Sequence, residues 1–66
     1  MTPFEALVHR VNNLLSTIDL QSEVARAEGS LAAHVEALAH ITESAARTRA
    51  ELELLKRRAR EATQDG

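Results

Sequence analysis

The side chains best suited to chemistry lie near the start of the chain, where His9 is followed four residues later by Asn13. On a helix these positions share a face, so an imidazole and an amide project to the same side. A neutral imidazole can attack the phosphorus of an acyl phosphate on a partner protein, and an amide can position a phosphoryl oxygen or a water. We therefore take His9 as a candidate phosphoacceptor and Asn13 as its positioning group. The alternative is a solvated histidine on a structural helix.

The composition allows few other kinds of functional site. The chain has no cysteine, and His9, His34 and His40 include no pair four residues apart, so nothing predicts a metal site. No Gly-rich phosphate-binding loop is present. We expect no cofactor, no ATP-binding site and no enzymatic activity beyond carrying a phosphoryl group, which excludes autophosphorylation by this chain alone.

Two long helices must position these residues. The segment Thr2-Pro3-Phe4-Glu5 combines an N-cap threonine, a proline at the first helical position and a glutamate that closes a capping box. Gly29 suits a helix C-cap, and Ser30 suits the next N-cap. The sequence predicts one all-α domain over 1–66, with helices at about 3–28 and 31–62 joined by a turn at 29–30.

Apolar residues recur in steps of three and four along both predicted helices, which indicates that each helix has an apolar stripe. If the chain reverses at the turn, facing residues have numbers that add up to about 59, as for Phe4 with Leu55 or Val11 with Thr48. His34 then lies opposite Ala25, where we expect a partly buried ring.

The stripes are wider than one helix pair can cover, and a core this small contributes only about 3–5 kcal/mol. A chain without disulfides or a metal site then needs a second copy, which predicts a homodimeric four-helix bundle. The alternative is a tetramer. The residues expected in the dimer core are Phe4, Leu7, Val11, Leu14, Leu15, Ile18, Ile41, Leu52 and Leu55.

The segment from His9 to Ile18, with its Asn-Asn-Leu-Leu sequence, resembles the phosphoacceptor helix of sensor histidine kinases. The resemblance implies a dimerisation and phosphotransfer hairpin that pairs with itself in a four-helix bundle. It also implies a response regulator receiver domain or a histidine kinase as partner. Arg10 replaces the acidic residue that the family uses as general base, which argues against a kinase reaction. The rival interpretation is a structural adaptor coiled coil without phosphotransfer.

Charge and hydropathy limit the partners and the cellular locations that we expect for the protein. A net charge of −2 argues against a nucleic-acid binder, which normally carries a basic excess. No apolar run approaches the roughly 18 residues of a membrane span, and no signal peptide is visible, so we expect a cytoplasmic protein without membrane contact. The basic segment 56–60 either contacts an anionic partner or complements the negative end of the second helix. The Glu43 and Arg47 pair is predicted to bridge one helical turn.

Overall fold

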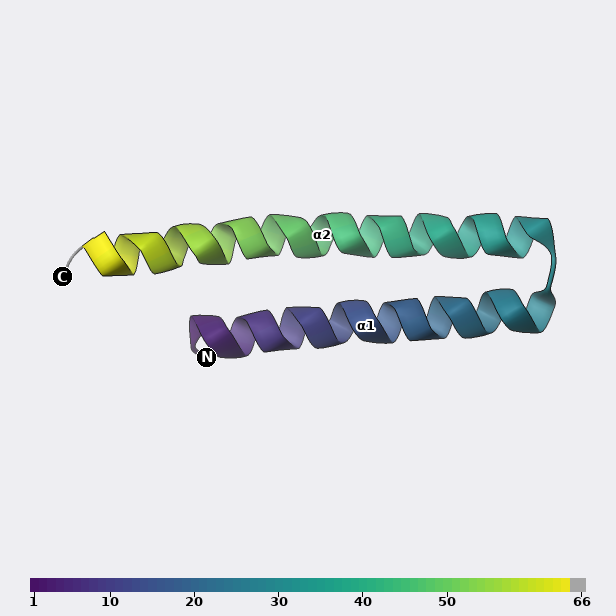
Figure 1. The fold of residues 1–66 in the computed structure, drawn as a ribbon, viewed down its shortest axis with the longest axis horizontal. Helices are drawn as coiled ribbons and strands as arrows, with labels where there is room; N and C mark the ends of the chain where they lie inside the picture. Colours follow the sequence, from purple (N-terminus) through teal and green to yellow (C-terminus); the bar gives the residue numbers. More distant parts are fainter. Residues whose placement is uncertain (65–66) are drawn as a thin grey trace.

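The computed structural model describes residues 1–64, which form two antiparallel helices joined by a two-residue connection (Figure 1). Helix α1 spans Pro3–Glu28 and helix α2 spans Leu31–Gln64. The predicted all-helical hairpin is confirmed. Because α2 is 34 residues long and α1 only 26, the end of α2 extends past the start of α1. We call this end of the hairpin the open end and the opposite end the turn end.

The start of α1 is fixed by the predicted capping box, which is confirmed. The Glu5 backbone N–H donates to Thr2 Oγ1 over 3.1 Å, and the Thr2 N–H donates to Glu5 Oε1 over 3.2 Å. Pro3 occupies the first turn, where its missing N–H costs nothing. These contacts satisfy donors that a helix N-terminus otherwise leaves unpaired, and they fix the residue at which the helix that carries His9 begins.

The turn between the helices is also formed by residues that are close together in the sequence. Gly29 has a φ of 70°, in the left-handed region that favours glycine, and its N–H donates to Ala25 O over 2.8 Å. Ser30 Oγ accepts from the Ala33 N–H over 3.0 Å and so caps the start of α2. Two residues therefore end one helix and begin the next, which forces the helices to lie side by side.

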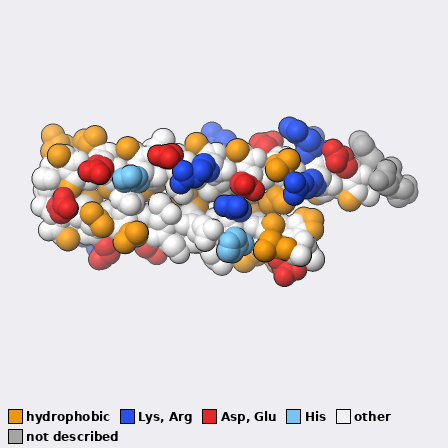
Figure 2. Space-filling model, turned by 180° about the vertical axis from the view of Figure 1, so that it is seen from behind, with side chains coloured by type: hydrophobic (Ala, Val, Ile, Leu, Met, Phe, Trp, Pro, Cys, Tyr) orange, Lys and Arg blue, Asp and Glu red, His pale blue; other side chains and the backbone are white. Residues whose placement is uncertain are grey.

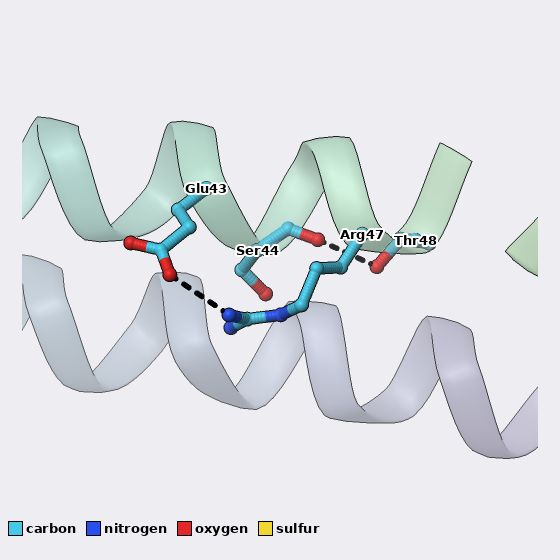
Figure 3. A network of polar contacts seen from close by, with 4 residues as sticks. All are labelled: Glu43, Ser44, Arg47 and Thr48. Atoms are coloured by element: carbon cyan, nitrogen blue, oxygen red, sulfur yellow. Dashed lines mark hydrogen bonds and ion pairs between the residues drawn. The ribbon is translucent and has the colours of Figure 1, made fainter. Parts of the chain in front are cut away.

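Small side chains make up the seam where α1 meets α2. The buried residues of the described chain are Ala25, Ala33, Ala37, Ser44 and Thr48. The Thr48 hydroxyl donates to Ser44 O over 2.9 Å, which satisfies it inside the seam (Figure 3). None of the described side chains is completely removed from solvent, so the hairpin alone has very little core.

Larger apolar side chains flank this seam and are only partly covered. Leu7, Leu52 and Leu55 line a hollow together with Phe4, which agrees with the predicted register near the open end. Phe4 and Val11 were expected to lie in the seam, yet they are 72% and 37% exposed. The seam is narrower than the apolar stripes because alanine, serine and threonine already fill the line of contact.

Surface ion pairs add little to this packing. The predicted pair between Glu43 and Arg47 is confirmed, with 2.9 Å between Oε1 and Nη1 (Figure 3). Closer to the end of α2, Lys56 Nζ lies 3.3 Å from Oε1 of Glu53, which is three residues before it. All four side chains are more than half exposed, and exposed pairs contribute about 0–1 kcal/mol each.

Candidate functional site

His9 lies on the outer side of α1, in the half of the hairpin near the open end, and its side chain is exposed. No hydrogen bond or ion pair engages either ring nitrogen within the described chain. The ring borders a shallow hollow that is also lined by Phe4, Val8 and Asn12. An imidazole in this position is open to approach by a second protein.

Asn13, the predicted positioning group, is also exposed on α1. Its backbone carbonyl oxygen accepts from Thr17 Oγ1 over 3.0 Å. Within the described residues, no hydrogen bond joins its side-chain amide to His9. Asn12 shares the hollow with His9 instead. Sequence reasoning did not give Asn12 a role, although positions i and i+3 are neighbours on a helix just as i and i+4 are.

Arg10 turns away from His9 and toward α2. Its Nη2 atom lies 3.7 Å from Glu51 Oε1, and the two side chains are 44% and 41% exposed. This pair was not predicted, although the numbers 10 and 51 fall close to the register of facing residues. In the structure, Arg10 therefore helps to join the helices, and its guanidinium is partly neutralised by a carboxylate.

The other two histidines have partners that His9 lacks. His34 is exposed, and its Nδ1 lies 2.7 Å from Ser30 O, so the ring bonds to the first turn of α2 and the predicted partial burial in the seam is wrong. The reason is that Ala25, Ala33 and Ala37 fill the seam at this level. His40 Nε2 lies 3.8 Å from Glu36 Oε1.

A second feature of the surface is a stripe of large apolar side chains along α1. Val8, Leu15 and Ser22 follow one another at intervals of seven residues, two helical turns, and so share one side of the helix. Phe4 and Val11 lie next to this line. Ser22 lines a hollow together with Leu38 of α2, which shows that this side of α1 and the exposed side of Leu38 belong to one face of the hairpin.

The same face continues on α2. Leu31, Leu38 and Leu52 are separated by multiples of seven residues, and Leu52 shares a hollow with Phe4 of α1. Val35 lies one turn from Leu31 on the same side. We call this surface the apolar face. Its exposed members are Phe4, Val8, Val11, Leu15, Leu31, Val35 and Leu38.

The opposite face carries charges. Its hollows are lined by Glu36 and His40 near the turn end, and by Arg47 and Glu51 nearer the open end. Leu20 is the most exposed large apolar residue there, at 60%. Figure 2 shows the hairpin from behind the view of Figure 1, with most of the Lys and Arg side chains toward the open end. One broad face of the hairpin is therefore apolar, and the opposite face is charged.

Within residues 1–64 no three His, Asp or Glu side chains are grouped so that they could hold a metal ion. Neither described helix has a segment long and apolar enough to cross a membrane. The fold defines the class of protein as an antiparallel helical hairpin. A scan of protein-family models and searches of curated proteins and of solved structures give no match.

Proposed function

We propose that the protein is a homodimeric four-helix bundle that serves as an interaction module in signalling, resembling the dimerisation hairpin of a histidine kinase. The observation that carries this proposal is the apolar face, on which seven large apolar side chains are 37–81% exposed. Contiguous apolar surface of this kind marks an interaction site in a soluble protein. A second copy presents the same face and can cover it by two-fold symmetry.

The broad side of the hairpin has the size that such an interface needs. The hairpin measures 55 × 16 × 10 Å, so this whole side, including the part of α2 that extends past α1, covers on the order of 900 Å². A stable interface buries about 800 Å² on each partner. The buried seam of one chain consists of alanine, serine and threonine, so most of the large apolar side chains can leave water only in an assembly.

The experiment is a measurement of solution mass by sedimentation equilibrium, in which we expect twice the chain mass of 7.2 kDa. Leu15→Asp places a charge in the apolar face, at a side chain that is 53% exposed and outside the seam, and should yield monomers. Ser16→Asp adds the same charge at the next residue and should remain dimeric. A monomeric wild-type chain, or equal masses for the two variants, would overturn the proposal.

A second function, phosphoryl acceptance by His9, is favoured by one specific observation: His9 is the histidine whose ring nitrogens are both free within the described chain. In this step a ring nitrogen of His9 attacks the phosphorus of an aspartyl phosphate on a receiver domain. The P–O bond to the aspartate breaks, an N–P bond forms, the carboxylate leaves, and the imidazole proton passes to solvent. The amide of Asn12 or Asn13 orients a phosphoryl oxygen.

Incubation with a phosphorylated receiver domain tests this function. We expect an acid-labile phosphohistidine on the wild type and on His40→Ala, and none on His9→Ala. Asn12→Ala and Asn13→Ala identify which amide assists, through a slower rate of labelling. If the wild type carries no label, His9 is a surface histidine and the protein is an adaptor, which leaves the dimer proposal intact.

A further inference from the structure

The charged face has a hollow at the turn end, with a volume of about 250 Å³. On α2 it is lined by Ala33 and Ala37, which are buried, and on α1 by Leu20 and Val24, which are 60% and 40% exposed. Leu20 and Val24 lie four residues apart and therefore on the same side of the helix. We call this site the turn-end hollow. Its apolar side chains stay in water even if a second copy covers the opposite, apolar face.

Carboxylates border the turn-end hollow on both helices. Glu28 lines it on α1 and Glu36 on α2, and both residues are exposed. Within the described chain neither carboxylate forms an ion pair with a lysine or an arginine. Glu36 Oε1 lies 3.8 Å from His40 Nε2, which makes an ion pair only when the imidazole is protonated. The hollow therefore combines apolar side chains with negative charge that the hairpin leaves unneutralised.

Three carboxylates further along α2 are each paired with a lysine or an arginine, namely Glu43, Glu51 and Glu53. Around the turn the balance differs, because residues 19–36 carry four carboxylates and one guanidinium, a net charge of −3. A local excess of one sign attracts a partner of the opposite sign and speeds its encounter. The charge around the turn-end hollow therefore favours a basic partner.

We propose that the turn-end hollow binds a basic amphipathic helix of another protein, whose apolar side chains contact Leu20 and Val24 while its lysine or arginine side chains pair with the two carboxylates. Sites for small molecules usually have volumes of about 300–1,000 Å³, so a hollow of about 250 Å³ suits one or two side chains of a protein partner instead. A hydrophobic groove accepts the apolar side of a helix in many complexes. Leu20 and Val24 are one turn apart, which matches the i, i+4 spacing of apolar side chains on such a helix.

This partner is distinct from those of the proposed function. Leu20 follows His9 by eleven residues, which is about 16 Å along α1 by helix rise, so a partner confined to the turn end does not contact His9. The apolar face, which a second copy would cover, lies on the opposite side of the hairpin. The inference therefore rests neither on the dimer nor on phosphotransfer, and a failure of either leaves it unaffected.

Amide chemical shifts in the NMR spectrum of the full chain test the site. The probe is a synthetic amphipathic peptide of about 14 residues built from leucine, alanine and lysine, long enough for about four helical turns. We expect saturable shifts centred on Leu20, Val24 and Ala33. Shifts confined to the apolar face, around Leu15 and Leu38, or no shifts at all, would overturn the proposal. Shifts in the hollow that grow with chain concentration before peptide is added would make a second copy the occupant and would also overturn it.

Charge removal at matched positions shows whether the attraction is specific to the hollow. Glu28→Gln combined with Glu36→Gln should raise the peptide dissociation constant about fivefold or more, because two exposed ion pairs are lost. Glu43→Gln combined with Glu53→Gln removes the same charge outside the hollow and should change the constant less than about twofold. Leu20→Ala should weaken binding through loss of apolar contact, and a peptide with glutamate in place of lysine should not bind. Equal weakening by the two double substitutions would show non-specific attraction and overturn the proposal.

Discussion

Truncation of Leu38 to alanine should weaken the dimer about 100-fold. Its side chain is 63% exposed in the single hairpin, on the apolar face. Removing three carbon atoms forfeits roughly 2.4 kcal/mol where burial is complete, at about 0.8 kcal/mol per carbon. Scaled by the fraction that dimerisation newly buries, the loss is about 1.5 kcal/mol per chain, or about 3 kcal/mol per dimer. Each 1.4 kcal/mol corresponds to a tenfold change in the dissociation constant.

Leu20→Ala is the matched control, because Leu20 is 60% exposed but lies among the hollows of the charged face. Sedimentation equilibrium over a dilution series gives the dissociation constant of each variant, and circular dichroism shows that helix content is retained. We expect Leu20→Ala to dimerise like the wild type. Equal weakening by the two substitutions would refute the assignment of the interface to one face.

Four further substitutions, at three positions, test the local contacts by urea unfolding. Gly29→Ala should cost about 1–2 kcal/mol, because φ is 70° and no atom lies within 4 Å of the added Cβ, so backbone strain is the whole effect. Gly29→Asn should cost less. Thr2→Ala should cost about 1 kcal/mol through loss of the capping box. Arg10→Ala should cost less than about 1 kcal/mol, because its ion pair with Glu51 is long and exposed.

The features that depend on neighbouring residues could be predicted from the sequence. The capping box at Thr2 and the reversal at Gly29 and Ser30 are formed by side chains and backbone groups within four residues of one another. Such contacts have strong residue preferences, because few side chains can accept from a helix N-terminus or adopt a positive φ. The bounds of both helices and the reversal of the chain follow from them, whereas the exposed position of His9 depends on which side of α1 packs against α2.

The features that depend on contact between the helices were harder to predict. The apolar pattern placed Phe4, Val11 and Thr48 in the seam. Thr48 is buried there, but Ala37 and Ser44, which the pattern did not select, occupy the rest of the line of closest contact. Periodicity identifies the side of a helix on which apolar residues gather. It does not distinguish apolar residues that face the other helix from apolar residues that face a partner. The ion pair between Arg10 and Glu51 was missed because it depends on this phase.

The two proposed functions use different sides of α1 and can therefore be tested separately. The proposed dimerisation would use the stripe of Phe4, Val8, Val11 and Leu15, whereas His9 lies on the outer side of the helix, at the edge of a hollow bordered by Val8. Packing of a second hairpin on the apolar face would cover that stripe and would leave the far side of the imidazole open to the proposed receiver domain.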